Sequence, residues 1–483
     1  MGSLTLVGLG HVVLASILSL DIIRHKRPVS AVLWLGVVWA FPYGGALGYL
    51  SFGVDRVTRG AKARAASNAF IERYAMLHPT FERIAVDERH VDRPDSPASH
   101  VFRATDPAVQ PFRVLRGHRL KLLVDGDQFF PALFEAVGAA RASVNLQTYI
   151  FRRDRTGREL LELLIERARA GVEVRLLYDR FGSTFAHFSG FFDAPRRAGV
   201  RVLSITQANL LKGRFQINLR NHRKVAIMDG RVGFVGGINI HDQNRTEYAE
   251  GAPIRDYHVQ FEGPAVRDLQ FLFIQDWFFA SREPPDQVLS QSLFPSPGLV
   301  GEGLVQVVPG GPERQGAGIL DAFFGAIVSA ERSVSIVTPY FVPDEPILQA
   351  LRYSALRGVA VRIVVPKVSN HRYTEFATRS LYGGLLEAGV RIFERRPPFI
   401  HGKALVVDDV YAMLGSANLD YRSLHLNFET NIEVADTDFV RAAVEQVAAE
   451  IAMSEEVLEA DYLRRSLPRQ LAERFCYLFQ PML

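Results

Sequence analysis

Two stretches of the sequence follow one pattern: NHRKVAIMD at residues 221–229 and HGKALVVD at residues 401–408. Each contains a His, any residue, a Lys, four further residues and an Asp. A second shared pattern follows in each copy, GGIN at 236–239 and GSAN at 415–418. In both copies an apolar run begins after the Lys, and a turn-forming Asp-Gly or Asp-Asp separates it from a second apolar run. We therefore expect each motif to open a β-hairpin, with its His and Lys on one face because strand side chains alternate.

These residue types in this order indicate phosphoryl transfer. A histidine acts as nucleophile or as general acid and base near neutral pH, and a lysine neutralises phosphate charge. Glycine lets the backbone approach a bulky phosphate, and an Asn amide donates to its oxygens. Two copies with the same tail are a much stronger signal than one. The candidate catalytic residues are His222, Lys224, Asp229, His401, Lys403 and Asp408, and the candidate substrate-binding residues are Gly237, Asn239, Ser416 and Asn418.

The two motifs lie in a duplicated region. AVGAARASVNLQTYIFRRD at 136–154 aligns with AIVSAERSVSIVTPYFVPD at 326–344, at a constant separation of 190 residues (326 against 136). GVEVRLL at 171–177 likewise corresponds to GVAVRIV at 358–364. Helical periodicity before Gly171 gives way to Val, Ile and Leu runs, which is typical of helices that cover a largely buried sheet. The predicted fold class is α/β, with two α/β sandwich halves related by internal duplication.

A carboxylate occupies the same place in both halves. RDYHVQF at 255–261 aligns with FETNIEV at 428–434, which matches Asp256 with Glu429. We expect each carboxylate to orient an imidazole and to stabilise imidazolium, and the alternative is a structural hydrogen bond or ion pair. No comparable repeated pattern surrounds His11, His118 or His371, and we expect these histidines to be structural or surface residues.

The N-terminal region contains two apolar stretches, at 4–20 and 29–54, separated by RHKRP at 24–28. Crossing a bilayer takes about 20 apolar residues. A cleaved signal peptide is the alternative, but no Lys or Arg precedes the first stretch and a second stretch follows at once. We therefore expect a transmembrane helical hairpin that is retained in the protein.

The predicted order of domains follows from these features. Two membrane helices occupy 1–55, a charged connecting segment 56–111, the first half 112–282, a Pro- and Ser-rich linker 283–302, and the second half 303–483. Basic residues flank the second apolar stretch on both sides, so the positive-inside rule hardly distinguishes the two possible orientations in the membrane. The slightly larger count after the second stretch favours a cytoplasmic catalytic part.

Composition excludes several other classes of protein. The 56 Lys and Arg against 52 Asp and Glu give a net charge of only +4, which argues against a nucleic-acid-binding role. The 48% hydrophobic content excludes a mainly disordered chain. Cys476 is the single cysteine, so no intramolecular disulfide and no Cys-rich zinc site is expected.

With its two HKD motifs, the sequence resembles the phospholipase D superfamily, and more closely the membrane-anchored bacterial cardiolipin synthases. The resemblance covers nearly the whole chain. It includes the N-terminal apolar stretches, EGPAV at 262–266, TPYFVPD at 338–344 and GSANLDYRS at 415–423. It implies an enzyme of the bacterial inner membrane that works on phospholipids, with the lipid bilayer as its partner and without nucleic acid.

The resemblance also implies a mechanism. Both motifs form one site for a ping-pong phosphatidyl transfer that uses no metal ion and no cofactor. One histidine attacks the phosphorus of phosphatidylglycerol, and the other protonates the departing glycerol and then activates a second phosphatidylglycerol, which gives cardiolipin. Superfamily analogy favours His222 as the nucleophile.

Alternatives within this chemistry differ in the acceptor. A phospholipase D uses water, and other phosphatidyltransferases use another alcohol or phosphatidylethanolamine, and the motifs do not distinguish them. A cluster at Phe185, Phe188, Phe191 and Phe192 either contacts acyl chains or belongs to a helix core. The sequence carries no signal for an oligomeric state.

Overall fold

The computed structural model describes residues 2–26, 28–50, 56–77, 96–105, 111–205, 220–290, 293–295, 298–312 and 318–480. The chain divides into two compact units, residues 1–63 and 64–483. The division falls within helix α4 (Arg56–Leu77). The two apolar stretches belong to the first unit, and both His-x-Lys motifs belong to the second.

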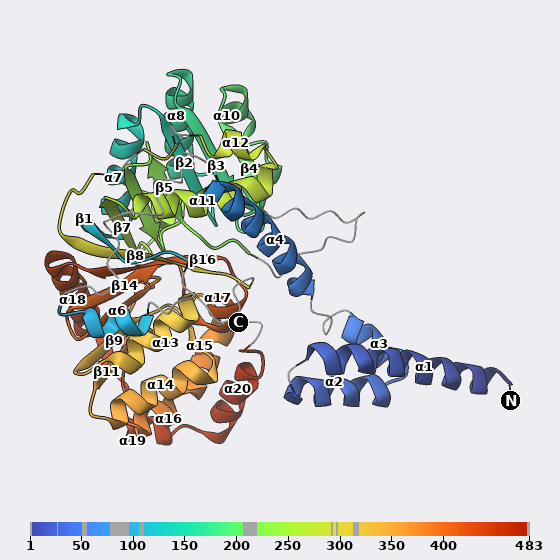
Figure 1. Cartoon of the computed structure of the whole chain (residues 1–483). Helices are drawn as coiled ribbons and strands as arrows, with labels where there is room; N and C mark the ends of the chain where they lie inside the picture. Colours follow the sequence, from blue (N-terminus) through green and yellow to red (C-terminus); the bar gives the residue numbers. More distant parts are fainter. Residues whose placement is uncertain are drawn as a thin grey trace. The chain divides into compact units, whose positions relative to one another are not determined.

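The first unit is built from α1 (Gly2–His25), α2 (Pro28–Ala40) and α3 (Gly44–Gly48) (Figure 1). The Trp39 indole donates a hydrogen bond to Ser19 Oγ at 3.0 Å, and the Tyr49 hydroxyl donates to Asp21 Oδ2 at 2.7 Å. A small apolar cluster holds the helices together, and most other apolar side chains of α1 and α2 are exposed. The buried members of the cluster are Ala15, Leu18, Ile22, Val38, Ala46 and Tyr49.

Among the described residues of this unit, one helix is long and apolar enough to cross a membrane. The window from Val7 to Arg24 in α1 has 18 residues and a mean hydropathy of 1.6, whereas the apolar part of α2, Ser30–Ala40, is shorter. Within the described residues, the predicted hairpin is therefore shown only as far as its first helix, and the stretch 29–54 is not one continuous helix. α2 ends at Ala40, and Pro42, which has no N–H, and Tyr43, at φ 56°, interrupt the helix before α3. Residues 51–55 of that prediction lie outside the described residues.

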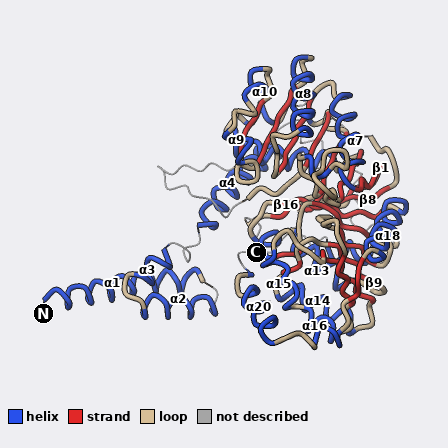
Figure 2. Tube along the Cα trace, turned by 180° about the vertical axis from the view of Figure 1, so that it is seen from behind, coloured by secondary structure: helices blue, strands red, loops and turns tan. Residues whose placement is uncertain are grey.

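The second unit contains one mixed sheet, which has 15 strands within the described residues (Figures 1 and 2). The two halves have the same strand order, and β1 and β8 pair antiparallel where they meet, with Leu115 opposite Val305. In the first half the order is β1 (Leu115–Val124), β7 (Tyr257–Glu262), β6 (Val232–Gly236), β5 (Val225–Met228), β2 (Ser143–Thr148), β3 (Glu173–Tyr178) and β4 (Arg201–Ser204).

The second half repeats this order and adds one edge strand. Its order is β8 (Gly303–Gly310), β16 (Glu429–Ala435), β14 (Tyr411–Gly415), β13 (Ala404–Val407), β9 (Ser333–Val337), β11 (Ala360–Pro366), β12 (Arg391–Arg395) and β17 (Ser454–Glu456). In both halves the last three shared strands are parallel to one another. The predicted α/β fold with two similar halves is confirmed.

Helices cover the sheet on both faces, which explains why all six residues of β2 are buried (Figure 2). In α8, Asp154 caps the N-terminus by accepting from Gly157 N at 3.0 Å, and the periodic Leu160, Leu161 and Leu164 are buried. The helices of the first half are α7 (Asp125–Ala139), α8 (Arg155–Arg169), α9 (Thr184–Phe188), α10 (Asp193–Arg197), α11 (Val266–Ser281) and α12 (Pro285–Val288), with η3 (Asp242–Asn244). Those of the second half are α13 (Ile319–Ser329), α14 (Glu345–Leu356), α15 (Arg372–Ser380), α16 (Tyr382–Glu387), α17 (Tyr421–His425), α18 (Thr437–Ala452), α19 (Glu459–Leu463) and α20 (Leu467–Tyr477). A further helix, α6 (Ser99–Thr105), packs against α13.

Each His-x-Lys motif opens a β-hairpin, as predicted. β5 pairs antiparallel with β6, and β13 with β14. The turns contain residues at positive φ: Asp229 and Gly230 at 53° and 60°, and Asp408 and Asp409 at 53° and 59°. Asp and Gly are the residues that such hairpin turns favour. The two turns therefore have the same local cause in the sequence.

Candidate active site

The start of each motif is hydrogen-bonded to the opposite half. The backbone N–H of His222 donates to Phe428 O at 2.8 Å, and that of His401 donates to Arg255 O at 2.7 Å. Phe428 and Arg255 precede the aligned residues Glu429 and Asp256. The duplication thus produces two equivalent contacts, which bring both histidines to the junction of the halves.

The carboxylates that hold the imidazoles are exchanged between the halves. His222 Nδ1 lies 3.0 Å from Glu429 Oε2, and His401 Nδ1 lies 2.6 Å from Asp256 Oδ2. Glu429 is further fixed by Ser416 Oγ, which donates to Oε2 at 2.6 Å. A carboxylate on Nδ1 orients the ring and directs Nε2 away from it. Each half therefore supplies the imidazole of one pair and the carboxylate of the other.

Burial keeps both imidazoles neutral at neutral pH. It lowers the pKa of His222 to about 4, although Glu429 acts in the opposite direction. It lowers the pKa of His401 to about 4 as well, with the charge of Lys403 as the next cause. A neutral imidazole has a free ring nitrogen, which a nucleophile or a general base requires.

The motif lysines lie against their own histidines. Lys224 Nζ donates to His222 O at 2.6 Å, and Lys403 Nζ lies 2.7 Å from His401 Nδ1 and 3.1 Å from Nε2. Burial lowers the pKa of Lys224 to about 7 and that of Lys403 to about 8. An anion beside such buried ammonium groups favours their charged form. The two lysines therefore suit the binding of one phosphodiester.

The motif aspartates do not line this site. Asp229 accepts backbone hydrogen bonds from Arg141, Ala142 and Ser143 at 2.9, 2.7 and 2.8 Å. Asp408 accepts the equivalent bonds from Glu331, Arg332 and Ser333 at 2.9, 2.7 and 2.7 Å, and His100 Nε2 lies 3.0 Å from it. Both carboxylates tie the hairpin turn to the start of the neighbouring strand, β2 or β9.

The shared glycine and serine lie behind the site, and the shared asparagines lie at its wall. A Cβ on Gly237 would lie 2.1 Å from Asp256 Oδ1, so glycine is what allows the carboxylate to approach. Ser416 is fully buried against Glu429. Asn239 accepts from Ile150 N at 3.0 Å, and Asn418 donates to Asp420 at 3.1 Å. Only Asn239 and Asn418 of these four line the cavity described next.

A cavity of about 290 Å³ joins the two motifs, and both histidines line it. The Tyr149 ring lies 4.8 Å from the His222 ring in an edge-to-face arrangement, and the Tyr340 ring lies 6.2 Å from that of His401. Tyr149 directly follows Thr148, and Tyr340 lies two residues after the aligned Thr338, so proximity to these threonines was the available sequence signal. The lining residues that the sequence analysis did not single out as functional include Tyr149, Arg220, Tyr340, His371, Asp420 and Arg422. His371, expected to be a structural or surface residue, is exposed and also lines this cavity.

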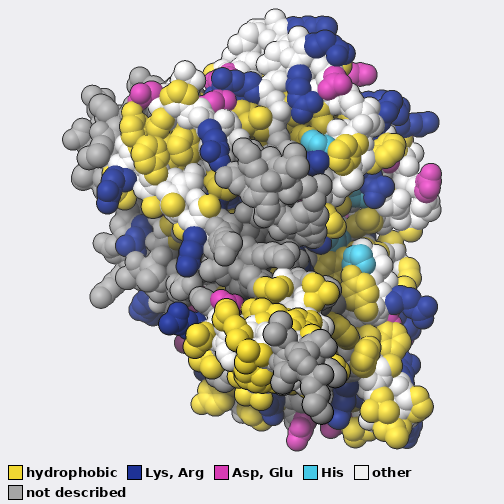
Figure 3. Space-filling model, turned by 90° about the vertical axis from the view of Figure 1, so that its right-hand side faces the viewer, with side chains coloured by type: hydrophobic (Ala, Val, Ile, Leu, Met, Phe, Trp, Pro, Cys, Tyr) yellow, Lys and Arg dark blue, Asp and Glu magenta, His cyan; other side chains and the backbone are white. Residues whose placement is uncertain are grey.

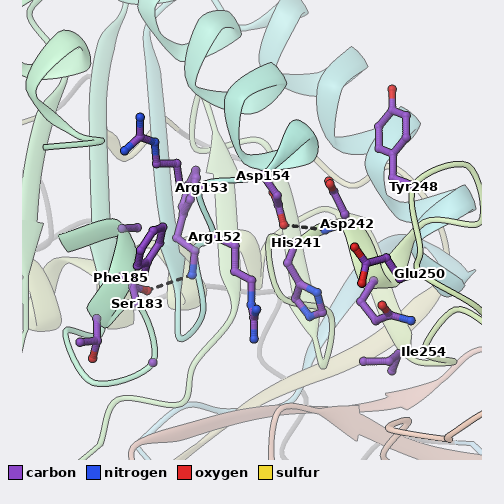
Figure 4. A pocket seen from close by; sticks show the side chains of 15 residues that line it. Arg152, Arg153, Asp154, Ser183, Phe185, His241, Asp242, Tyr248, Glu250 and Ile254 are labelled. Carbon is purple, nitrogen blue, oxygen red and sulfur yellow. Dashed lines mark hydrogen bonds between the residues drawn. The ribbon is translucent and has the colours of Figure 1, made fainter. Parts of the chain in front are cut away.

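A second cavity, of about 630 Å³, lies in the first half (Figure 4). Phe151 and His241 line it. Ile150, directly before Phe151, and Asn239, two residues before His241, line the first cavity instead. The His241 ring is buried, which lowers its pKa to about 4, and Arg152 lies beside it (Figure 4). In the repeat, Arg152 and His241 correspond to Val342 and Asp420, which are buried in the short pairing of β10 (Phe341–Val342) with β15 (Leu419–Asp420). This cavity thus marks a difference between the halves.

The phenylalanine cluster divides into two pairs. Phe192 is buried and Phe191 is half-buried in the core of the first half, whereas Phe185 is 74% and Phe188 69% exposed. Phe185 also lines the second cavity. Phe191 and Phe192 therefore belong to the core, whereas contact of the exposed Phe185 and Phe188 with acyl chains stays a prediction.

Comparisons with known proteins agree over almost the full length. Residues 133–266 and 324–451 match the family model described as cardiolipin synthase, PLD-like domain, and residues 13–53 match the phospholipase D-nuclease N-terminal model. The cardiolipin synthase of Geobacillus thermodenitrificans is 34% identical over 99% of this chain and 93% of the relative. Cardiolipin synthase A of Pseudomonas fluorescens is 37% identical over 96% of this chain and 94% of the relative.

A solved structure supports the fold alone. The crystal structure of phosphatidylserine synthase from Haemophilus influenzae Rd KW20 superposes with a TM-score of 0.59. It covers 77% of this chain and 97% of that chain at 15% sequence identity. The duplicated architecture is therefore shared with a protein of much lower sequence similarity.

Proposed function

The chain belongs to the cardiolipin synthases of the phospholipase D superfamily, and from this premise we propose that it converts two phosphatidylglycerol molecules into cardiolipin and glycerol through a phosphatidyl-histidine intermediate. One observation carries the mechanism. His222 and His401 line one cavity, and the carboxylate of the opposite half engages Nδ1 of each ring. Nε2 of each ring is then the atom that meets the phosphodiester.

In the first step, His222 Nε2 attacks the phosphorus of phosphatidylglycerol. The bond from phosphorus to the head-group oxygen breaks, and His401 gives its proton to the departing glycerol. Although burial lowers the pKa of His401 to about 4, an anionic phosphodiester beside the ring acts in the opposite direction, as Asp256 does. The assignment of His222 as nucleophile rests on superfamily analogy.

In the second step, the now neutral His401 takes the proton from a head-group hydroxyl of the second phosphatidylglycerol. That oxygen attacks phosphorus, the bond from phosphorus to Nε2 breaks, and its electron pair returns to His222. The protonation states of both histidines are thereby restored. Lys224 and Lys403 neutralise the diester throughout, and Asn239 and Asn418 contact its oxygens.

Six further residues act by positioning. Asp256 and Glu429 orient the imidazoles, Gly237 leaves room for Asp256, and Ser416 holds Glu429 through a hydrogen bond. Asp229 and Asp408 fix the hairpins through three backbone N–H groups each. We assign these two aspartates to the support of the motif rather than to contact with the lipid.

We place the enzyme at the bacterial inner membrane, with its catalytic part in the cytoplasm. α1 is long enough to cross, and α2 with α3, interrupted at Pro42, forms the returning arm of a multi-pass anchor. Figure 3 shows exposed hydrophobic side chains in yellow and exposed Lys and Arg side chains in dark blue. Cationic and apolar groups together suit a surface of anionic lipids.

The test is mass analysis of the lipids after the purified protein is incubated with phosphatidylglycerol bilayers. We expect cardiolipin and an equal amount of glycerol from the wild type, and neither from His401→Ala. Phosphatidic acid without cardiolipin would instead assign water as the acceptor.

The nucleophile is identified by rapid acid quenching and peptide mass analysis. We expect the phosphatidyl adduct on the peptide that contains His222 in the wild type, and none in His222→Ala. An adduct on the His401 peptide in the wild type would reverse the two roles.

A further inference from the structure

The active-site cavity contains a second pair of cations besides the two motif lysines. Arg220 directly precedes the Asn-His-Arg-Lys motif of the first half, and Arg422 lies in α17 of the second half. Both line the cavity with His222 and His401. The pair thus has the same two-half origin as the reacting groups, although neither arginine belongs to the repeated motif.

Tyr149 locates the two arginines next to the reacting histidine. Arg220 is hydrogen-bonded to the Tyr149 side chain, and both Arg220 and Arg422 lie close enough for their charges to lower the pKa of this phenol, against a larger effect of burial. The Tyr149 ring in turn lies 4.8 Å from the His222 ring. Both guanidinium groups therefore lie near Tyr149, whose ring is next to the histidine that reacts with phosphorus.

The arrangement of the arginines favours an anion between them. Burial, and after it the charge of Arg220, lowers the pKa of Arg422. The Arg220 guanidinium is held 4.1 Å above the Phe181 ring, and its Nε is buried with no hydrogen-bond partner within the described part of the chain. A phosphodiester offers planar guanidinium groups two acceptor oxygens and removes the repulsion between like charges.

The proposed reaction needs two phosphate sites. The diester that is transferred lies between the histidines, where Lys224 and Lys403 contact His222 O and the His401 ring. The acceptor lipid brings a second anionic diester, which only the three carbons of a glycerol separate from the reacting oxygen. We infer that Arg220 and Arg422 bind the phosphodiester of the acceptor phosphatidylglycerol, an inference that rests on the proposed function.

The neighbouring surface suits the rest of that lipid. Phe181, under Arg220, is 50% exposed, and Phe188, under Arg180 at 5.1 Å, is 69% exposed. Exposed aromatic side chains beside arginines are suited to the boundary between head groups and acyl chains. The acceptor would therefore lie with its phosphate on Arg220 and Arg422 and its acyl chains along Phe181 and Phe188.

The test compares a lipid acceptor with a soluble one in a single assay. The full-length protein in phosphatidylglycerol vesicles is given deuterated glycerol, and mass analysis records both cardiolipin and deuterated phosphatidylglycerol. Glycerol exchange requires the donor diester and both histidines but no second phosphate. For Arg220→Gln and Arg422→Gln, we expect the ratio of cardiolipin formation to exchange to fall at least about tenfold. Arg464→Gln, which removes an exposed guanidinium outside the cavity and outside the proposed lipid surface, should keep the wild-type ratio.

A second measurement needs no variant. Glycerol 3-phosphate carries a phosphate next to its free hydroxyls, and we expect it to be an acceptor with a KM at least about tenfold below that of glycerol in the wild type. Equal KM values, or equal ratios in all three variants while the wild type still makes cardiolipin, would overturn the second phosphate site and leave the proposed function standing. A wild type that exchanges glycerol but makes no cardiolipin would overturn both.

Discussion

The two halves of the catalytic unit share one strand order but differ beside the site. At the reacting centre they are matched, with one His, one Lys, one Asn and one carboxylate from each. Around it they diverge: Arg152 and His241 line a cavity of about 630 Å³, whereas the corresponding Val342 and Asp420 pair in β10 and β15, and Asp420 lines the active-site cavity instead. In the proposed mechanism the two histidines take different roles, His222 as nucleophile and His401 as acid and base. The halves therefore need the same residue types at the reacting centre, but they do not need the same surroundings.

The exchange of carboxylates shows why neither half is complete alone. Glu429 of the second half holds His222, and Asp256 of the first half holds His401. A substitution of either carboxylate therefore first affects the imidazole of the opposite half. This coupling gives the largest of the effects expected below.

Glu429→Gln and Asp256→Asn should each lower kcat for cardiolipin formation by about 100- to 10,000-fold, because an amide neither fixes the tautomer nor stabilises imidazolium. Steady-state lipid analysis gives the rates. Glu456→Gln, which removes a surface ion pair with Arg391, is the matched control and should stay within about twofold. Retention of more than a tenth of the activity in either variant would show that the imidazoles do not depend on the opposite half.

The lysines should separate the halves by pH. Burial lowers the pKa of Lys224 to about 7 and that of Lys403 to about 8, so each loses its charge at lower pH than a free lysine, and Lys224 does so first. Since an anionic lipid needs the charged form, loss of the Lys224 charge should make the fall of kcat/KM with pH steeper by about tenfold per pH unit above about 7. Below that, kcat/KM should rise as the pH falls toward about 4, because the first step needs His401 protonated, and it should fall at still lower pH, where His222 loses its free ring nitrogen.

Lys224→Arg keeps its charge at every pH of the assay and should move this upper limb toward 8, whereas Lys403→Arg should leave it near 7. Profiles of kcat/KM between pH 4 and 10 decide this. An upper limb that moves equally in both variants would make the lysines equivalent and remove this difference between the halves.

Much of this could be predicted from the sequence because the duplication repeats its local signals. The α/β halves, both hairpins and the match of Asp256 with Glu429 all follow from alignment and strand periodicity. The exchange of the carboxylates could not, since it depends on how two halves meet through β1 and β8. Pro42 indicated that the helix of the second apolar stretch is interrupted, but hydropathy, which is uniform along this stretch, did not show the interruption. Arg220, Arg422 and His371 fall outside the repeated motif, so no internal comparison marked them.

The smallest effects on rate are expected at the motif aspartates, although they stand in the same pattern as the catalytic residues. Asp229→Asn and Asp408→Asn weaken charge-assisted bonds to three backbone N–H groups, which should cost about 1–3 kcal/mol of stability. Asp408 also contacts His100, so its variant should lower Tm more. Below the unfolding temperature both should keep kcat within about threefold.

His100→Ala sharpens this last comparison. Without that contact the two aspartates have equivalent partners, so Asp229→Asn and Asp408→Asn should lower Tm by equal amounts in the His100→Ala background. Thermal unfolding of the single and double variants measures this coupling directly. Hydrogen bonds confined to a hairpin turn change the fraction of folded molecules but leave the turnover of each folded molecule nearly unchanged. A loss of kcat as large as that of the carboxylate variants would therefore mean that Asp229 and Asp408 contribute to the chemistry.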